Sequence, residues 1–390
     1  MRIAMIGQKG IPAIQGGIER HVHDLSLGLV EKGQDVTVYA RKWYTPEEKK
    51  SFAGIKIKHL PSIRTKHLDA ISHTFFATLH AIKNNFDVIH YHGVGPSLLA
   101  WIPRIFAPRT LVITTFHCID RYHQKWNPLA KLILHLGEKT ACFFPHKTIV
   151  ISQGLQKYCL EKYNKETIYI PNGINPIEEK DSDQITQFGL KKDEYLVMIS
   201  RLIPHKGAHI LIEAFNNLKK NNPENKTIQN LKLAIVGGSA FTDDYVRQLH
   251  ELASSNNQII FTDFQSGKTV DQLYANSLAL VHPSLNEGLP ITVIQAMSHG
   301  KPVLLTDIAE HLELNTNDNL IFKENDVQDL EEKMLYFINL NDEEKKSFGI
   351  ENKQIIEENY LWKNLIPKVI EVYQRKTRES QPKKLLTENI

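Results

Sequence analysis

Short runs of β-branched and aliphatic residues alternate with amphipathic helical stretches, and this alternation constrains the fold most. In residues 1–170 the strand-like runs are 2–6, 36–39, 55–59, 88–91, 111–115, 148–151 and 167–170. Helical periodicity fills the intervals at 18–31, 68–84, 97–106, 128–143 and 153–163. Strands that alternate with helices form a parallel sheet with helices on both faces. The first half therefore predicts one α/β domain.

The second half repeats the pattern. Strands are expected at 195–200, 231–236, 259–261, 279–282, 303–306 and 320–322, and helices at 208–220, 242–254, 269–276, 290–298, 327–339 and 342–358. Pro171-Asn172-Gly173 and the aperiodic polar segment 175–193 predict an inter-domain linker. We therefore expect two Rossmann-like domains facing across a cleft, residues 1–174 and 175–360, with a last amphipathic helix within 361–378.

Charge is unevenly distributed along the 390 residues. Residues 1–170 carry 23 Lys and Arg against 12 Asp and Glu, whereas the rest carries 24 against 32. A basic first half favours an anionic phospholipid surface or a lipid-phosphate acceptor, although scattered lysines can equally form a solvated face. The charges follow no nucleic-acid-binding motif, so nucleic acid is not expected.

The sequence also bears on localisation. Residues 1–7 lead directly into a strand without the anatomy of a signal peptide, which predicts a cytoplasmic protein. No apolar run reaches the roughly 20 residues of a spanning helix, so any membrane contact is expected to be peripheral. The basic segment 121–126, followed by the apolar helix 128–143, is the sequence candidate for such contact at the inner face of the membrane.

Residues 282–302 suggest a ligand loop. An apolar strand there runs into a loop with Glu287 and Gly288, and a helix follows near Leu289 and Pro290. Backbone N–H groups at a helix N-terminus attract anions, and Glu287 can accept hydrogen bonds from hydroxyls. Both features suit a nucleotide sugar. Alternatively, the glycine and proline only turn the strand into the helix.

Two further loops carry groups that suit a phosphate. Arg201 and Lys206 follow a predicted strand and can converge on one diphosphate. Gly16-Gly17 precedes a helix, where a tight turn leaves amides free, although glycines at such turns are often only steric. The first turn lacks Gly-x-Gly-x-x-Gly, which disfavours a dinucleotide site, and 266–269 lacks the first glycine of a P-loop.

Histidines follow two strands of the first half. His117 lies at a predicted strand end, where open α/β sheets bind ligands. His90 and His92 flank Tyr91 without a carboxylate at metal-ligand spacing. We therefore assign no metal.

The motifs occur in a recognisable order: Gly16-Gly17-x-Glu19, His117, Pro171-Asn172-Gly173, Ser200-Arg201…Lys206-Gly207, Val236-Gly237-Gly238 and Pro283-Ser284…Glu287-Gly288-x-Pro290. This pattern resembles the retaining glycosyltransferases of family 4, and the N-terminal motif resembles a bacterial branch that assembles surface polysaccharides. The resemblance implies a GT-B fold, donor binding in the C-terminal domain, acceptor binding in the N-terminal domain, and a last helix that crosses back to the N-terminal domain.

The resemblance also implies roles for single residues. Arg201 and Lys206 would bind the diphosphate, Glu287 the sugar hydroxyls, and His117 the sugar near its reacting carbon. Gly16, Gly17, Gly237, Gly288 and Leu289 would complete the donor site, without metal or cofactor. The family commonly has a second glutamate eight positions after Glu287, where this chain has Gln295. This substitution leaves the choice among UDP-, GDP- and dTDP-sugars open.

The leading hypothesis is a retaining transferase that moves sugar from a nucleoside diphosphate to a lipid-linked or polysaccharide acceptor. Two alternatives remain. One is a GT-B epimerase or phosphorylase, which needs no acceptor or needs free phosphate. The other is a non-catalytic nucleotide-sugar-binding subunit, a reading that Gln295 favours.

Overall fold

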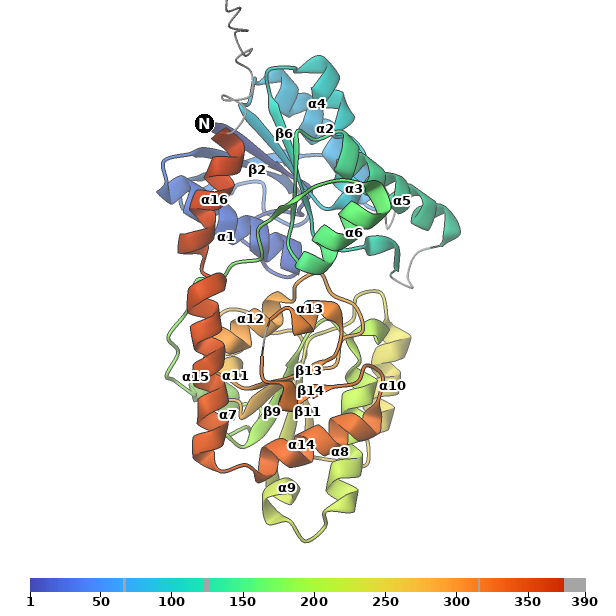
Figure 1. Ribbon diagram of the computed structural model, residues 1–390, viewed down its shortest axis with the longest axis vertical. Coiled ribbons are helices and arrows are strands. Elements are labelled where there is room, and N and C mark those ends of the chain that lie inside the picture. The colour runs from blue at the N-terminus through green and yellow to red at the C-terminus, as the bar shows by residue number, and fades with distance from the viewer. Residues whose placement is uncertain (66–67, 123–126, 315, 375–390) are drawn as a thin grey trace, which may run out of the picture. The chain divides into compact units, whose positions relative to one another are not determined.

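The computed structural model describes residues 1–65, 68–122, 127–314 and 316–374, which divide into two compact units (Figure 1). The first unit contains Met1–Ile151, Leu155–Pro171 and, among the described residues after Leu361, Trp362–Gln374. The second contains Ser152–Gly154 and Asn172–Leu361. Each unit buries its own hydrophobic core between a sheet and its helices.

The first unit is built on an eight-stranded sheet with the order β3-β4-β2-β1-β5-β6-β7-β8. Its strands are β1 (Arg2–Ile6), β2 (Asp35–Arg41), β3 (Ser51–Phe52), β4 (Ile55–Leu60), β5 (Val88–His92), β6 (Leu111–Phe116), β7 (Lys147–Val150) and β8 (Ile168–Tyr169). Only the short β3, which was not predicted, pairs antiparallel among these strands. The strand order reverses between β1 and β5, and sheets of this kind bind ligands at such a point.

Helices cover this sheet: α1 (Gly17–Glu31), α2 (Asp69–Lys83), α3 (Val94–Ser97), α4 (Trp101–Phe106), α5 (Pro128–Phe143), α6 (Gln153–Tyr163) and α16 (Trp362–Gln374), with a 3-10 turn, η1, at Asp120–Tyr122. The last helix packs against α1, as expected (Figure 1). Gly28 allows the close approach, since a Cβ there would lie 2.6 Å from Ile366 Cγ1. Residues 375–378 of the predicted helix lie outside the described residues.

The single helix predicted at 97–106 is wrong. The chain forms α3, a turn and then α4. Pro103 has no N–H to donate to the Leu99 carbonyl, and its ring would clash with that carbonyl in a continuous helix. The Leu99 carbonyl instead accepts from the Ile102 N–H at 3.1 Å. The prolines thus divide this stretch into two short helices.

The second unit has a six-stranded parallel sheet with the order β11-β10-β9-β12-β13-β14. Its strands are β9 (Tyr195–Ile199), β10 (Lys232–Val236), β11 (Ile259–Phe261), β12 (Ala279–His282), β13 (Val303–Thr306) and β14 (Ile321–Phe322). Aliphatic side chains of these strands, such as Met198, Ile235 and Val281, pack against the helices. Each of these three is fully buried.

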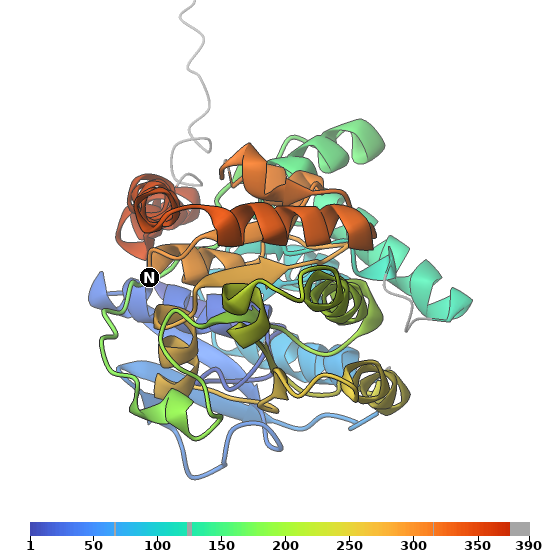
Figure 2. The same ribbon diagram turned by 90° about the horizontal axis from the view of Figure 1, so that it is seen from below.

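The longer helices of the second unit are α8 (Ala208–Asn221), α10 (Asp243–Ala253), α11 (Lys268–Ala275), α12 (Ile291–Ser298), α14 (Val327–Asn339) and α15 (Asp342–Asn359). Short helices and turns lie at α7 (Asp183–Thr186), η2 (Pro204–Lys206), α9 (Lys226–Asn230), α13 (Ala309–Leu312) and η3 (Asp318–Leu320). Helix α8 packs against both α10 and α14 (Figure 2). No helix among the described residues is long and apolar enough to cross a membrane.

Candidate functional site

A buried polar group lies at the carboxyl ends of the strands of the second unit. Glu287, in the loop between β12 and α12, forms an ion pair with Lys206 of the η2 turn. His282, the last residue of β12, places Nε2 at 2.8 Å from Glu287 Oε1. The structure thus brings together Lys206 and Glu287, which the sequence predicted, and adds His282, which it did not assign to the site.

The backbone of the two loops holds these side chains in place. Leu285 N–H donates to the His205 carbonyl at 2.9 Å, which ties the loop of Glu287 to the turn of Lys206. Gly207 adopts a left-handed φ of 73°, and a Cβ there would lie 2.1 Å from the Pro283 carbonyl oxygen. Glycine is therefore required where the chain leaves the turn and enters α8.

Electrostatics keeps the carboxylate of Glu287 charged. Burial would raise its pKa, but the charge of Lys206 and the hydrogen bond from His282 outweigh burial, so the pKa lies well below its usual value. Burial lowers the pKa of His282, while Glu287 opposes that shift. A neutral His282 donates from Nε2 to the carboxylate, which sets its tautomer. Glu287 remains an acceptor for hydroxyl groups at neutral pH.

Arg201 begins the loop that ends at Lys206, directly after β9. Its side chain is exposed and makes no ion pair with any described residue. Gly237, after the neighbouring strand β10, has φ 145°, and a Cβ there would lie 1.8 Å from the Ser200 carbonyl oxygen. Gly237 thus lets the ends of β9 and β10 approach each other. The exposed guanidinium of Arg201 can form a fork around an anion.

The remaining predicted donor residues surround the start of α12. This helix begins at Ile291 with Pro290 as its N-cap residue, one position after the predicted start. Gly288 and Leu289 are buried just before it, and the Leu289 carbonyl accepts from Asn172 Nδ2 at 2.7 Å. Gln295 is half-buried in the second turn. N–H groups in the first turn have no intrahelical acceptor and suit an anion.

The first unit carries Gly16, Gly17 and His117. Gly16 has φ 103° and precedes α1, which starts at Gly17. Glu19, in the first turn of α1, accepts from the Lys9 N–H at 3.2 Å and so closes the loop after β1. Gly16 thus lies at a turn that leads directly into α1, and its role at the donor phosphates stays a prediction.

His117 lies among other histidines at the carboxyl ends of β5 and β6. Its Nε2 lies 3.2 Å from His92 Nδ1, and its ring meets that of His21 edge-on with centroids 4.7 Å apart. Burial, followed by neighbouring histidines, lowers the pKa values of His92 and His117 well below the usual value. Both are therefore neutral. The sequence did not predict this cluster. The available signal was the position of the three histidines, since His92 and His117 follow neighbouring strands and His21 lies on the first helix.

Two described groups could hold a metal ion by the proximity of their ligand atoms. His21, His92 and His117 form one group, and His282, Glu287 and His311 form the other. Within each group the ligand atoms lie within 4.8 Å of one another. Neutral imidazoles are suitable ligands for zinc and similar ions. Each group includes a residue predicted to contact the donor, so metal dependence requires a direct test.

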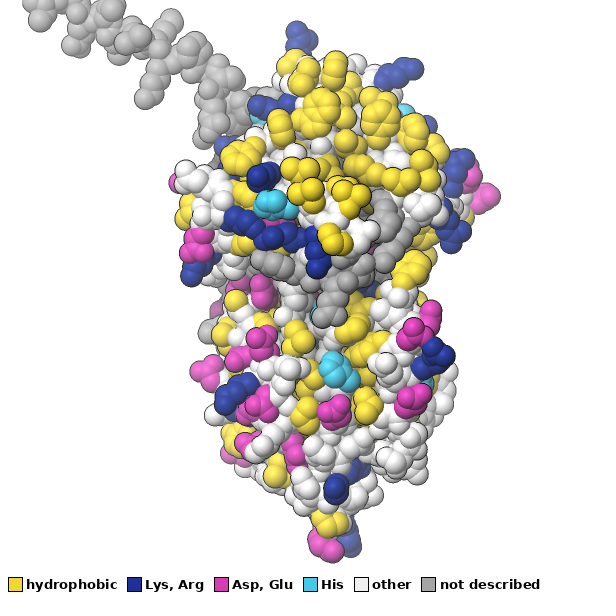
Figure 3. Space-filling view, turned by 90° about the vertical axis from the view of Figure 1, so that its right-hand side faces the viewer, with side chains coloured by type: hydrophobic (Ala, Val, Ile, Leu, Met, Phe, Trp, Pro, Cys, Tyr) yellow, Lys and Arg dark blue, Asp and Glu magenta, His cyan; other side chains and the backbone are white. Residues whose placement is uncertain are grey.

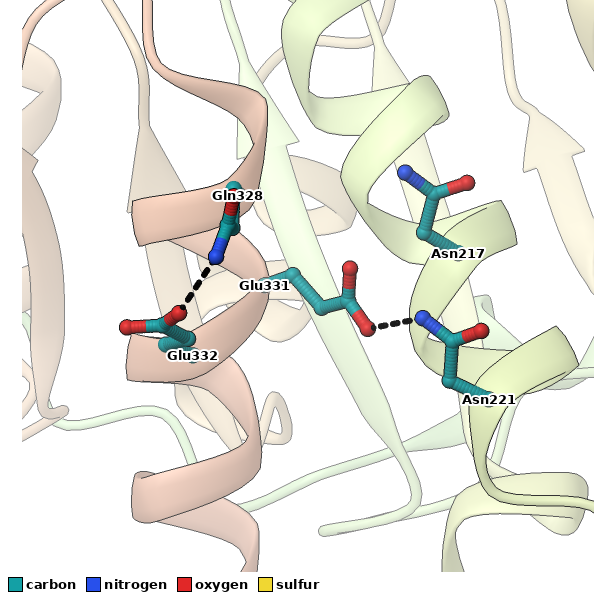
Figure 4. Close-up of a pocket in the computed structure, with 5 residues that line it drawn as sticks. All are labelled: Asn217, Asn221, Gln328, Glu331 and Glu332. Atoms are coloured by element: carbon teal, nitrogen blue, oxygen red, sulfur yellow. Dashed lines mark hydrogen bonds between the residues drawn. The ribbon is translucent and has the colours of Figure 1, made fainter.

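A polar depression of about 340 Å³ lies elsewhere in the second unit, between α8 and α14 (Figure 4). Asn221 Nδ2 donates to Glu331 Oε1 at 2.7 Å, and Gln328 donates to Glu332 at 3.0 Å. Amides and carboxylates line this depression, which includes none of the predicted site residues and no cation. A nucleoside diphosphate would meet carboxylates there, so we do not assign it to the donor.

Comparison with known proteins identifies the family. Residues 15–178 match the model for Glycosyltransferase Family 4, and residues 180–355 match that for Glycosyl transferases group 1. The chain belongs to the family 4 glycosyltransferases. Among relatives of this glycosyltransferase, O-antigen chain mannosyltransferase C of Escherichia coli is 23% identical and aligns with 96% of this chain and 98% of that protein.

Solved structures show that the glycosyltransferase has the GT-B fold. Sucrose-phosphate synthase of Thermosynechococcus elongatus matches with a TM-score of 0.80 and 18% identity, over 97% of this chain and 100% of that chain. HepE of Anabaena, in complex with UDP and glucose, matches with a TM-score of 0.76 and 19% identity, over 95% of this chain and 99% of that chain. The predicted fold class is confirmed.

Proposed function

We propose that this glycosyltransferase moves a sugar, with retention of anomeric configuration, from a nucleoside diphosphate to a lipid-linked or polysaccharide acceptor in cell-surface glycan synthesis. The observation that carries the proposal is the ionised Glu287, whose side chain is 9% exposed and lies between Lys206 and His282 at the carboxyl ends of parallel strands. Similarity to an O-antigen mannosyltransferase supports the glycan acceptor, and the UDP complex of HepE supports the donor class.

The charged side chains of the site serve two parts of such a donor, the sugar and the diphosphate. Glu287 accepts hydrogen bonds from the sugar hydroxyls, while Lys206 and Arg201 neutralise the diphosphate. N–H groups at the start of α12 add partial positive charge next to Gly288 and Leu289. Lys206 pairs with Glu287, so this carboxylate also positions the ammonium group next to the proposed diphosphate site.

The transfer requires no nucleophile from the protein. The bond between the anomeric carbon and the diphosphate oxygen breaks, and the acceptor hydroxyl forms a new bond to the same face of that carbon. The hydroxyl proton passes to a phosphate oxygen of the departing nucleoside diphosphate. Two cations and a helix N-terminus stabilise the negative charge that develops on the leaving group, which is the usual role of a divalent metal.

The proposal also covers the donor, the sugar and the setting of the reaction. The donor is a UDP-, GDP- or dTDP-sugar, and Gln295 contacts the nucleoside portion. His117 contacts the sugar near its reacting carbon, and the loop of Gly16 and Gly17 approaches the phosphates. The enzyme works in the cytoplasm, at the inner face of the membrane, without metal or nucleic acid.

The test is turnover with a panel of UDP-, GDP- and dTDP-sugars, with and without a lipid-linked acceptor. We expect release of nucleoside diphosphate that depends on acceptor, and by NMR a product with the anomeric configuration of the donor. Conversion of the donor without acceptor would instead identify an epimerase, and a requirement for free phosphate a phosphorylase. Saturable binding without turnover across the panel would identify a non-catalytic subunit.

A further inference from the structure

Helix α5 of the first unit presents an apolar stripe to solvent. Leu129, Leu132, Ile133, Leu136 and Phe143 recur at helical spacing and are 44–66% exposed. The buried side of the helix carries the smaller Gly137 and Ala141, together with Glu138. A surface helix of a soluble domain normally turns its apolar stripe toward the core. The outward stripe on α5 therefore indicates an occupant that the isolated chain does not include.

Two other helices extend this apolar surface. Phe75 and Phe76 on α2 are 42% and 40% exposed, and Ile105 and Phe106 on α4 are 62% and 67% exposed. Helix α2 contacts both α4 and α3, and α3 contacts α5, so the three helices belong to one connected group on the first unit. Figure 3 shows hydrophobic side chains spread widely over the first unit on the side of α5. We call these outward faces of α2, α4 and α5 the apolar face.

Cations outnumber acidic residues on the helices of the apolar face: α2, α4 and α5 carry Lys83, Arg104, Lys131 and Lys139 against Asp69 and Glu138. Lys83, Arg104, Arg109, Lys131 and Lys139 are exposed on or beside its helices, and none pairs with an acidic group among the described residues. The sequence has no Asp or Glu between residues 88 and 119. The face therefore needs a partner that is apolar in part and negatively charged.

The two acidic residues on α2 and α5 do not oppose this charge. Asp69 pairs with Arg41 at 3.0 Å. Glu138 is fully buried and pairs with Arg121 at 2.9 Å. Both carboxylates are thus neutralised within the unit, and the cations at the surface determine what the apolar face attracts.

We propose that the apolar face seats the first unit on a bilayer that contains anionic phospholipids. Leucine, isoleucine and phenylalanine side chains enter the boundary between headgroups and acyl chains, and the lysines and arginines contact lipid phosphates. Helix α5, at 16 residues, is roughly 24 Å long and lies in the plane of that boundary. A second copy of the chain is a poorer partner, because two such cationic faces repel each other.

This docking serves the proposed function, since a lipid-linked acceptor is presented at the same membrane. It also refines the sequence prediction, which placed membrane contact on segment 121–126 and the helix that follows. Residues 123–126 lie outside the described residues. The helix that follows is α5, and α2 and α4 were not predicted to take part.

The test is co-sedimentation of the full chain with phosphatidylcholine vesicles, alone or mixed with phosphatidylglycerol. We expect binding only to the mixed vesicles. Lys131→Glu/Lys139→Glu should weaken it about thirtyfold or more, at about 1 kcal/mol for each cation removed. Leu132→Gln/Ile133→Gln should weaken it at least as much. Ile350→Gln, a 60% exposed isoleucine on α15 of the second unit, is the matched control and should bind like the parent chain.

Other outcomes would overturn the proposal. Equal binding to both kinds of vesicle, no binding, or parent-like binding by both double variants would each do so. A chain that is dimeric by analytical ultracentrifugation, and becomes monomeric in Leu132→Gln/Ile133→Gln, would assign the face to a second copy. Turnover on a water-soluble acceptor distinguishes the two proposals, because it tests the transferase without requiring docking.

Discussion

His282 Nε2 donates a hydrogen bond of 2.8 Å to Glu287 Oε1, from a ring that is 1% exposed. The two residues are five positions apart, at the end of β12 and in the loop that follows. The opposite nitrogen of the ring, Nδ1, finds no hydrogen-bond partner among the described residues. Among the described residues, the hydrogen bond to Glu287 is thus the one that the ring of His282 makes, and it orients the carboxylate of Glu287.

Removing this donor should lower catalytic efficiency without abolishing it. We expect His282→Ala to reduce kcat/KM by roughly tenfold to a hundredfold, because hydrogen bonds to charged groups contribute about 1.5–3 kcal/mol. His282→Gln retains an N–H and should recover part of the loss, and the exposed His250→Ala on α10 serves as control. Steady-state kinetics would contradict the assignment if His282→Gln were as impaired as His282→Ala.

Arg201 should matter through its forked guanidinium. We expect Arg201→Ala to lower kcat/KM by about a hundredfold and Arg201→Lys by less, since lysine keeps the charge but not the two parallel donors. Arg247→Ala removes an exposed arginine from α10 and is the matched control. Full activity of Arg201→Ala would remove this residue from the diphosphate site.

Gln295→Glu should tighten donor binding. A carboxylate can accept charge-assisted hydrogen bonds from ribose hydroxyls, which favours the variant by about 1–2 kcal/mol, or roughly fivefold to thirtyfold in Kd. Gln328→Glu adds the same charge on α14, outside the site, and should leave Kd unchanged. Calorimetry that finds no tightening, or weaker binding, would place Gln295 away from the ribose.

Turnover should be independent of divalent metal. Prior dialysis against a chelator should change the rate by less than about twofold, because in the proposed mechanism Arg201, Lys206 and the α12 N-terminus supply the positive charge. If activity falls and returns with zinc or another ion, His21→Gln and His311→Gln would show which of the two histidine groups binds it. A metal-dependent rate would refute the metal-free mechanism.

His73 should make the first unit less stable in mild acid. Burial, and then the charge of Arg41, lowers its pKa from 6.5 to about 4. As pH falls from 6.5 toward 4, His73 binds a proton in the unfolded chain but not in the folded chain, so the free energy of unfolding decreases. His73→Gln should reduce the loss between pH 6.5 and 4.5 by about 2 kcal/mol. Urea unfolding at several pH values measures it, and an unchanged slope would contradict the expected shift.

Local sequence patterns were sufficient for most of the fold. The strands at 279–282 and 303–306 were predicted to the residue, because each is a short apolar run with a proline directly next to one end. The helix at 97–106 failed because proline rules act through the carbonyl four residues earlier, and the apolar periodicity masked them. Lys206 and Glu287 were predicted from loop motifs, and the structure pairs them.

Contacts between distant elements could not be read in the same way. His21 on α1, His92 at the end of β5 and His117 just after β6 meet because β5 and β6 are neighbours in the sheet and their ends lie close to His21. Strand order is a property of the folded sheet, and no local periodicity encodes it. The hydrogen bond of His282 likewise depends on how the loop after β12 folds back.

The packing of α16 on α1 at Gly28 has a consequence for synthesis. Trp362, Leu365, Ile366, Val369, Val372 and Tyr373 complete the core that β1 and α1 begin. The ribosome must therefore synthesise the whole second unit before the first unit can complete its hydrophobic core. Nascent chains usually finish their N-terminal domain first. Here we expect the second unit to fold first. The apolar side chains of α1 that pack against α16 stay exposed until the last helix has been synthesised.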